Sequence, residues 1–381
     1  MAALDEEIRP RLTDAEAKGV VEAEWSHLRG VDAIEPLPSY DDQNFLLTLR
    51  GNRRAVLKIA ASGAPCRGGA GEAVTAGYLD CEHAMMRALA SAGAEAPEPV
   101  PSDDGREVVP FKWTDLTCFA RVVTFLQGDA LSDLRGHGDD GLFKMLGATL
   151  GAADVALATL APRPDGADAE SRILAWDLAN AARVSRPYLD DVLDADVRMR
   201  VAAGLEGLEQ LLASPEYASL PRQLVHGDAN DENIFCRREA SGAWAVALID
   251  FGDFVRSARV FDLAIFLAYA LFDGRGQNMA TLLADAVPDP AAALEVQRRA
   301  CVVAKGYHAV CPLTRAEVDA LPTLIKARNC QTILNAAHGF KLDPDPYRLV
   351  SAEPAKRLLR QMEMLDRKKF RAELRRACGY S

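Results

Sequence analysis

The fold is decided by two stretches in the second half of the chain, His226-Gly227-Asp228-Ala229-Asn230-Asp231-Glu232-Asn233 and Ile249-Asp250-Phe251-Gly252-Asp253. Between them, residues 234–237 and 244–249 have the composition of two short strands joined through a Ser241-Gly242 turn. Reflecting this hairpin about its turn places Asn233 opposite Asp250. Two oxygen-bearing side chains are therefore expected side by side at its base, with Asp228 in the loop just before it.

These residue types, in this order, suit phosphoryl transfer. The spacing His-x-Asp, then four residues, then Asn, followed by Asp-Phe-Gly, is typical of a phosphoryl-transfer site. Such a site needs a carboxylate that accepts a proton from the substrate hydroxyl, and oxygen ligands for the Mg²⁺ that bridges nucleotide phosphates. We predict Asp228 as the catalytic base and Asn233 and Asp250 as Mg²⁺ ligands. Simple turn capping by Asp and Asn would explain one of these residues, not all three.

A lysine in the first half of the chain is a candidate nucleotide ligand. Lys58 lies in the apolar run 55–59, a strand pattern whose lysine contacts nucleotide phosphates in some phosphotransferases. Glu82 falls on a predicted helix, 72–92, and a carboxylate buried there would need a partner. We predict that Glu82 pairs with Lys58 and holds it toward the phosphates. A lysine on an edge strand and a solvated glutamate are the alternatives.

Three further residues are expected near the site. Asn44 belongs to the segment 39–45, which lies between the first two strands and is predicted to cover the phosphates through side-chain donors, although a plain hairpin turn fits equally well. His226 is expected to orient the catalytic loop. Asp262 opens an apolar helix and is expected to support that loop through backbone N–H groups or His226, unless it only favours the start of its own helix.

The distribution of strand and helix patterns predicts an α+β fold with two lobes. Residues 1–126 form the N-terminal, nucleotide-covering lobe, and residues 127–381 the larger, mostly helical lobe with the catalytic loop, metal site and substrate pocket. The first lobe has capping-box signals at Thr13 and Glu16 and strand patterns at 45–49, 55–59, 107–109 and 119–125. The second lobe has helical patterns at 142–155, 172–184, 195–214, 259–272, 291–306, from Thr314 onward and at 352–377.

Composition excludes several classes of protein. The 381 residues carry a net charge of −11, so neither nucleic acid nor an anionic membrane is an expected partner. The longest apolar run, 260–272, is shorter than a membrane span and contains Asp262. The eight cysteines have no CxxC spacing, which argues against zinc and for reduced thiols in the cytoplasm. No GxxxxGK[ST] segment is present, so the P-loop class is excluded.

Taken together, these motifs resemble the aminoglycoside phosphotransferase and choline kinase group of protein-kinase-like enzymes, over roughly residues 40–361. Within that group, the segments 39–45, 226–233 and 249–253 are similar to those of hydroxylysine kinases, as are Pro312-Leu313-Thr314 and Arg328-Asn329-Cys330-Gln331. The resemblance implies a bilobal kinase-like fold. It also implies transfer of the γ-phosphoryl group of GTP or ATP to the side-chain hydroxyl of 5-hydroxylysine, with Mg²⁺ as cofactor.

The expected acceptor carries two ammonium groups and one carboxylate. By charge complementarity, Asp231, Glu232 and Asp253 are candidates for the amines. A carboxylate favours a bidentate arginine, for which Arg328 is the first candidate and Arg256 and Arg259 are the others. A plain surface charge remains the alternative for each of these residues.

Two other functions remain open at this point. The acceptor could be another amino alcohol, such as homoserine, choline or an aminoglycoside. Alternatively, the chain could be a non-catalytic protein with a kinase fold that binds nucleotide. The presence together of Lys58, Asp228, Asn233 and Asp250 argues against the second. The sequence leaves oligomeric state and pathway open.

Overall fold

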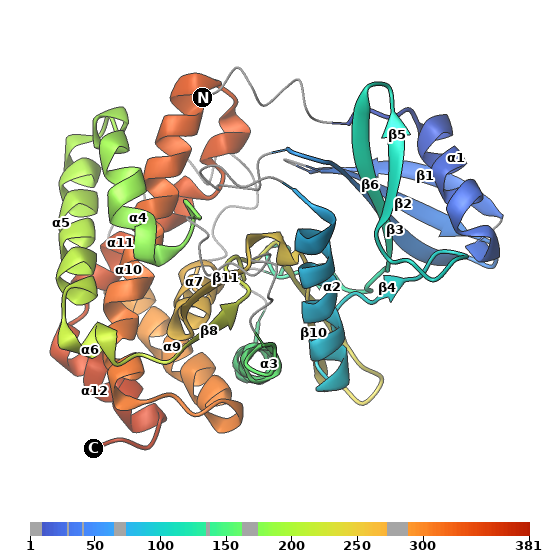
Figure 1. Ribbon diagram of the computed structural model, residues 1–381. Helices are drawn as coiled ribbons and strands as arrows, with labels where there is room; N and C mark the ends of the chain where they lie inside the picture. The colour runs from blue at the N-terminus through green and yellow to red at the C-terminus, as the bar shows by residue number, and fades with distance from the viewer. Residues whose placement is uncertain are drawn as a thin grey trace.

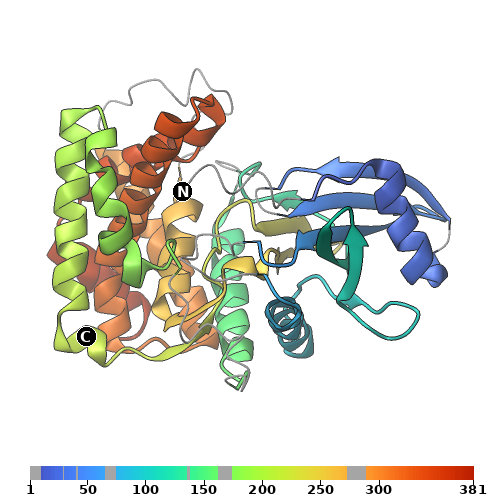
Figure 2. The same cartoon turned by 45° about the horizontal axis from the view of Figure 1, so that its top comes forward.

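The computed structural model describes residues 10–28, 30–39, 42–64, 74–134, 138–161, 174–272 and 289–381. Figure 1 shows an antiparallel sheet with helix α1 on one side of the molecule and a group of helices on the other. In the turned view of Figure 2 the two parts again lie side by side. The predicted α+β class, with a β-rich first part and a helical second part, is confirmed. The boundary at 126/127 stays a prediction.

The first part is built on a six-stranded antiparallel sheet of order β1-β2-β3-β6-β4, with β5 also pairing with β6. The elements are α1 (Asp14–Glu24), β1 (Val31–Leu37), β2 (Gln43–Leu49), β3 (Arg53–Ala61), α2 (Ala76–Ser91), β4 (Pro99–Val100), β5 (Val109–Trp113) and β6 (Leu116–Thr124), with a 3₁₀ turn at Ser26–Leu28. The predicted capping box of Thr13 and Glu16 is confirmed at the start of α1.

The two faces of this sheet pack against different helices. Leu57 and Ile59 of β3 pack with residues of α1 in one apolar cluster, whereas Ala60, on the opposite face, packs with residues of α2. Because side chains alternate along a strand, Lys58 also projects from the α2 face. It pairs across the sheet with Asn44 of β2 and Arg121 of β6. These three polar residues therefore form a row on the α2 face.

The second part is mostly helical. Its α-helices are α3 (Asp140–Leu157), α4 (Leu178–Ser185), α5 (Ala195–Leu212), α6 (Pro215–Ala218), α7 (Val260–Ala270), α9 (Pro290–Val310), α10 (Arg315–Leu342), α11 (Ala352–Met364) and α12 (Arg367–Ala377). Short 3₁₀ helices cover Arg186–Asp191, Phe251–Asp253 and Pro346–Leu349. The predicted capping box of Thr314 and Glu317 is confirmed at α10.

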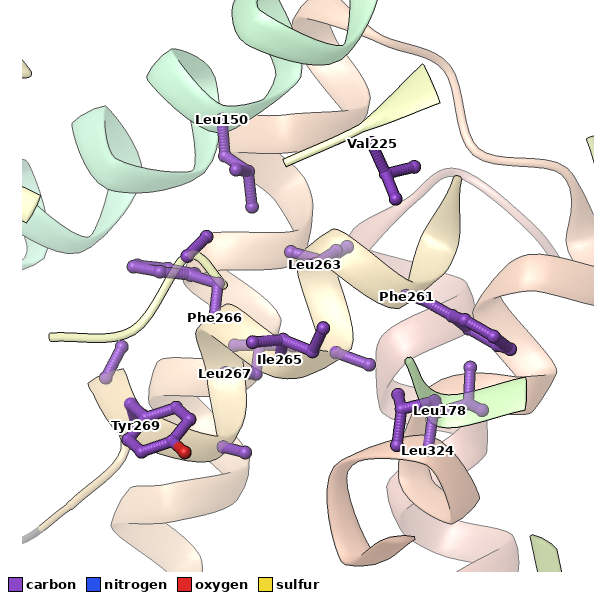
Figure 3. Packing of buried hydrophobic residues seen from close by; sticks show 14 of the residues in the cluster. Leu150, Leu178, Val225, Phe261, Leu263, Ile265, Phe266, Leu267, Tyr269 and Leu324 are labelled. Atoms are coloured by element: carbon purple, nitrogen blue, oxygen red, sulfur yellow. The ribbon is translucent and has the colours of Figure 1, made fainter. Parts of the chain in front are cut away.

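Helix α7 forms the centre of this part. All of its residues are buried, and Figure 3 shows its side chains among Leu150 of α3, Val225, Leu178 of α4 and Leu324 of α10. The apolar run 260–272 is thus a core helix, held by burial on all sides. Among the described residues, no helix is both long and apolar enough to cross a membrane.

Helices α3 and α9 approach each other at glycine positions. A Cβ atom on Gly147 would lie 2.1 Å from the carbonyl oxygen of Val303, and one on Gly306 would lie 2.2 Å from that of Lys144. One on Gly151 would lie 2.9 Å from the carbonyl oxygen of Tyr307. The two backbones therefore touch, and any larger residue would force them apart.

Two small sheets carry the motif region. One has the order β10-β9-β7, from β7 (Asp129–Ala130), β9 (Ile234–Arg238) and β10 (Trp244–Leu248), and the other pairs β8 (Arg222–Val225) with β11 (Val255–Ala258). The hairpin of β9 and β10 is confirmed, but its predicted register is wrong by one residue. Ile234 pairs with Leu248, and the backbone N–H of Ile249 donates to the carbonyl of Asn233 at 3.0 Å. Asn233 is thus opposite Ile249, and Asp250 is the next residue along.

Other predicted elements need correction. The single helix expected at 352–377 is two helices, because Asp366 caps a new one by accepting a hydrogen bond from the backbone of Lys369. The strand expected at 107–109 begins at Val109 and continues to Trp113. Strands β8 and β11, which flank the motif region, were not predicted. Residues 72–73 and 172–173 of two predicted helices, 65–71 of a predicted loop, and Tyr40 and Asp41 lie outside the described residues.

Candidate active site

The carboxylate of Asp262, on α7, accepts hydrogen bonds from the backbone of the loop that follows β8. One carboxylate oxygen of Asp262 accepts from the backbone N–H of His226 at 2.6 Å, and the other from that of Gly227 at 2.8 Å. The imidazole of His226 lies 3.0 Å from the carbonyl of Ile249 through Nε2, and its Nδ1 accepts from the backbone N–H of Asp228 at 3.3 Å. The proton is therefore on Nε2. Both residues occupy the supporting positions expected of them.

Gly227 allows this loop to lie against the Asp-Phe-Gly segment. Its φ is +82°, and a Cβ atom there would lie 2.1 Å from the carbonyl oxygen of Asp253. Only glycine combines this left-handed conformation with so close a backbone contact. The two quoted stretches are thus packed directly on each other.

Asp228 is almost fully buried, and both of its carboxylate oxygens accept hydrogen bonds. One oxygen accepts from the side-chain amides of Asn230 at 2.9 Å and Asn233 at 3.2 Å. The other accepts from the guanidinium of Arg328, on α10, at 2.9 Å. This set of donors fixes the orientation of the carboxylate, as catalysis by a general base requires.

The structure places Arg328 differently from the prediction. Its side chain is 1% exposed, and it donates to the carbonyl of Trp176 and to Gln331 as well as to Asp228. Burial by itself lowers the pKa of Arg328, but the nearby Tyr269 and Asp228 together raise it. The guanidinium is thus a charged partner of Asp228 and is not open to a substrate carboxylate. Another candidate for that role, Arg259, is also occupied, because it pairs with Glu317 at 2.8 Å.

Asn233 and Asp250 offer oxygen atoms of the kind that Mg²⁺ prefers. The amide nitrogen of Asn233 donates to the backbone and side chain of Asp228, at 2.9 and 3.2 Å, so its amide oxygen points elsewhere. The side chain of Asp250 is 32% exposed and lies 3.7 Å from the ammonium of Lys58. Its backbone has φ +61°, an uncommon conformation for a residue other than glycine and one that recurs at functional sites.

The described residues contain no group of three or more His, Cys, Asp or Glu side chains suited to a metal ion. Magnesium seldom needs one, because it is commonly held by one or two protein oxygens together with substrate phosphates and water. The pair of Asn233 and Asp250 fits that pattern. Lys58, beside Asp250, adds the positive charge that nucleotide phosphates require. Asn44, opposite Lys58 in the sheet, has a buried amide oxygen for which the described residues provide no hydrogen-bond donor.

The predicted pair of Lys58 and Glu82 is wrong. Glu82 is buried, as expected, but its partner is Arg121 of β6, at 2.5 Å. Arg121 also contacts Asp42, at 3.3 Å, just before β2. Burial lowers the pKa of Arg121, but Glu82 and Asp42 more than compensate and keep it protonated. Arg121 therefore links α2 to the segment that leads into β2, while Lys58 faces Asp250.

Helix α2 also touches the Asp-Phe-Gly segment directly. The hydroxyl of Tyr78 donates to the carbonyl of Gly252, and its ring lies against that of Phe254 with 5.0 Å between centroids. The β-rich part is thereby connected to the metal-ligand candidates by one helix.

The three acidic residues expected near substrate amines are not equivalent. Asp253 is buried beside Gly227, and its charge lies close enough to Arg328 to raise the pKa of that arginine. Asp231 is buried and lines a small pocket with Leu131, Tyr269, Phe272 and Arg299. Glu232 is exposed. The structure thus brings Asp253 close to the Asp228–Arg328 pair and leaves Glu232 in solvent.

Two residues of this region were missed by the sequence reasoning. Arg121 interrupts the apolar strand 118–123, and Asp154 interrupts the apolar stripe of α3. A charged residue in an otherwise apolar pattern indicates a buried charge that needs a partner. The same argument was applied to Glu82 and would have found both.

The buried pair of Glu82 and Arg121 leads to a stability prediction. Replacing either residue by Gln is expected to lower the free energy of unfolding by about 3–5 kcal/mol, because the remaining charge is left buried without its partner. The double variant should lose less than the sum of the two. A double-mutant cycle in chemical denaturation measures this coupling.

The matched control for this cycle is Arg87→Gln, on the same helix. Arg87 is half exposed and pairs with Glu107 near the surface, so its loss should cost no more than about 1 kcal/mol. Strictly additive losses for Glu82 and Arg121 would contradict the coupling.

The fold and this arrangement of a supported aspartate, an Asn-Asp pair and a lysine define a protein-kinase-like phosphotransferase that acts on an alcohol group. The chain belongs to the phosphotransferase enzyme family, whose profile matches residues 33–296.

Curated relatives of this chain carry a more specific name. It is 26% identical over 364 residues to a hydroxylysine kinase of Xenopus laevis, covering 91% of this chain and 88% of that protein. It is also 26% identical over 389 residues to a hydroxylysine kinase of Bos taurus, covering 94% and 92%. The similarity to hydroxylysine kinases thus extends over nearly the whole length of both proteins.

Solved structures with this fold include other small-molecule kinases. The amicoumacin kinase hAmiN, in complex with AMP-PNP, Ca²⁺ and Ami, has a TM-score of 0.62 at 17% identity and covers 93% of each chain. A microcompartment-associated aminopropanol kinase has a TM-score of 0.64 at 16% identity, covering 90% of this chain and 95% of its own. At this level of identity the likeness concerns the fold.

Proposed function

We propose that this protein transfers the γ-phosphoryl group of GTP or ATP to the side-chain hydroxyl of 5-hydroxylysine. The observation that carries the proposal is the meeting of Asp228, Asn233, Asp250 and Lys58 at one site in a chain similar to hydroxylysine kinases along most of its length. The match to the phosphotransferase enzyme family supports the reaction class. The choice of acceptor is supported by the similarity to hydroxylysine kinases.

In this proposal Asp228 is the base. As the hydroxyl oxygen of the acceptor bonds to the γ-phosphorus, the bond from that phosphorus to the leaving β-phosphate oxygen breaks, and the hydroxyl proton passes to Asp228. The donors from Arg328, Asn230 and Asn233 hold the carboxylate in place for this transfer.

The phosphate groups would lie between the two parts of the molecule. Lys58 is proposed to bind them directly, and Asn233 and Asp250 to hold Mg²⁺ against them. When bound, Mg²⁺ supplies charge neutralisation at the phosphoryl oxygens. Lys58 lies 3.7 Å from Asp250, so the proposed phosphate lysine and the proposed metal ligand would act on the same phosphates. The nucleotide and Ca²⁺ of the amicoumacin kinase complex support a donor nucleotide and a divalent cation in this role.

The acceptor amines are proposed to meet buried acidic side chains. Asp253, close to Arg328, and Asp231, at the small pocket with Tyr269, are the stronger candidates. Glu232 is exposed, so it can contribute only at the edge of the site. A cationic amino alcohol, with its amine near its hydroxyl, suits this distribution of charge.

An acceptor panel tests the proposal. We expect kcat/KM for 5-hydroxylysine to exceed that for homoserine, choline and kanamycin, with Mg²⁺ and saturating GTP or ATP. A site that hydrogen-bonds substrate groups can discriminate by roughly 10⁴-fold against analogues without them. Initial rates of nucleoside diphosphate release with each acceptor provide the measurement.

Lysine is the control in this panel, because it has the charges of hydroxylysine but no hydroxyl to phosphorylate. It should give no phosphorylated product. A clear preference for any other acceptor would refute the choice of hydroxylysine and leave the phosphotransferase class unaffected. Running the panel with each nucleotide in turn decides between GTP and ATP.

A further inference from the structure

The residue that supports the catalytic loop is itself in contact with a second buried acid. Asp262 of α7 forms a side-chain hydrogen bond with Asp154 of α3, and both side chains are fully buried. Neither carboxyl group has an ion-pair partner among the described residues. Two buried carboxylates in direct contact cannot both be ionised, because each raises the energy of the other. One of them must therefore carry a proton.

The hydrogen-bond donors around the pair indicate which acid is protonated. Asp262 accepts from two backbone N–H groups, at 2.6 and 2.8 Å, and both bonds favour its ionised form. Asp154 accepts from the hydroxyl of Tyr307, whereas Gln223 donates mainly to its backbone carbonyl, at 2.7 Å. Burial and the neighbouring Asp262 raise the pKa of Asp154 well above its usual range. Burial also raises the pKa of Asp262, but the backbone donors of His226 and Gly227 oppose that rise. The donors around the pair thus favour Asp154 as the acid that carries the proton.

We propose that Asp154 is a positioning residue whose protonated carboxyl group donates a hydrogen bond to Asp262 and so aims Asp262 at the backbone of the catalytic loop. Tyr307 of α9 donates a hydrogen bond to the carboxyl group of Asp154. A chain of hydrogen bonds then runs from α9 through α3 and α7 to His226 and Gly227. The inference rests on the proposed function, since the loop matters for turnover because it carries Asp228.

The close approach of α3 and α9 makes this chain possible. Gly151, three residues before Asp154, lies against the backbone of Tyr307. The tyrosine hydroxyl can therefore reach Asp154 across the helix contact. With side chains between the helices, the distance would be larger and the second donor would be lost.

The other charged and titratable groups near the pair come from several elements. Arg259, before α7, is already paired with Glu317 of α10, and the imidazole of His226 lies in the loop after β8. Asp177, just before α4, is a third acid and brings no positive charge to the pair. Cys311, just after α9, is a buried thiol whose pKa is raised by burial. The direct contact of Asp262 with another acid is its hydrogen bond to Asp154.

Two substitutions of Asp154 test whether this residue acts as a hydrogen-bond donor or only fills space. Asp154→Asn keeps a donor for Asp262 and an acceptor for Tyr307, so kcat is expected to stay within about threefold of wild type. Asp154→Leu has neither, and we expect kcat to fall at least tenfold while KM for nucleotide and acceptor changes less than threefold. Equal kcat losses in the two variants, or wild-type kcat in Asp154→Leu, would overturn the proposal.

Asp262→Asn is the matched control. It offers one oxygen to two backbone N–H donors, so its kcat should fall although the same conservative change is tolerated at position 154. If Asp154→Leu does not fold, as judged by its melting curve, Tyr307→Phe replaces it. That variant should lower kcat by a smaller factor, with KM unaltered. A kcat equal to wild type in Tyr307→Phe would remove α9 from the chain of hydrogen bonds.

Infrared spectroscopy tests the proton itself without any turnover. The difference spectrum between wild type and Asp154→Asn should contain the carbonyl band of a protonated carboxyl group at neutral pH. The band should persist in Asp228→Asn. Its absence from wild type would overturn the proposal even if the kinase function is correct. Its presence in a protein that does not phosphorylate hydroxylysine would refute only the proposed substrate.

Discussion

Replacing Asp228 by Asn is expected to lower kcat by roughly 10²–10⁴-fold, the usual contribution of a general base. The substitution preserves the volume of the side chain and one acceptor oxygen, but it removes the charge that is proposed to take up the hydroxyl proton. KM for the nucleotide should change little, because Lys58, Asn233 and Asp250 remain. Steady-state rates with saturating nucleotide and Mg²⁺ measure the effect.

A stability measurement must accompany this variant. Arg328 loses its charged partner in Asp228→Asn although it keeps the nearby Asp253, so some loss of stability is expected. A melting curve with and without nucleotide shows whether the variant is folded under assay conditions. Glu239→Gln, in the exposed turn of the β9–β10 hairpin, is the control and should match wild type. Activity of folded Asp228→Asn within threefold of wild type would remove Asp228 from the role of base.

Replacing Asp250 by Asn should lower kcat at least about 100-fold and raise the Mg²⁺ concentration needed for half-maximal rate. Loss of one electrostatic stabiliser of a transition state commonly costs 10²–10³-fold, and the neutral amide is a weaker magnesium ligand than the carboxylate. Asparagine is the substitution of choice because it tolerates the positive φ at this position better than alanine does.

The metal dependence distinguishes a ligand from a structural residue. Wild type should lose activity in EDTA and recover it with Mg²⁺, and Asp250→Asn should recover only part of it at high Mg²⁺. Nucleotide binding in EDTA should be similar in the two proteins. An unchanged Mg²⁺ titration in Asp250→Asn would exclude Asp250 as a ligand.

The part of the site that could be predicted from sequence lies in one short segment. Asp228, Asn233 and Asp250 are close because a loop and a tight hairpin join them, so their proximity follows from chain connectivity. The register error of one residue left the two ligand candidates at the same end of the hairpin, because Asp250 directly follows Ile249, which pairs with Asn233. The role of Asp262 could also be predicted from the sequence, since an acid at the start of an apolar helix has few hydrogen-bond donors within reach.

The contacts between distant segments could not be predicted in the same way. Glu82 has two cations within reach of its helix, Lys58 on β3 and Arg121 on β6, and they are cross-strand neighbours. Which of them it meets depends on the placement of α2 over the sheet, not on any local pattern. Likewise, the partner of Asp228 on α10 is 100 residues away in sequence. Its identity depends on how the helices of the second part pack.

The contact between α3 and α9 has a practical consequence for altering the acceptor. Gly147, Gly151 and Gly306 leave no space for a Cβ atom, so even alanine at these positions would push two core helices apart. A mutant library aimed at new acceptors should therefore hold these three codons constant. Diversity is better placed at exposed positions on the rim of the site, such as Glu232, where a new side chain meets solvent and not another backbone.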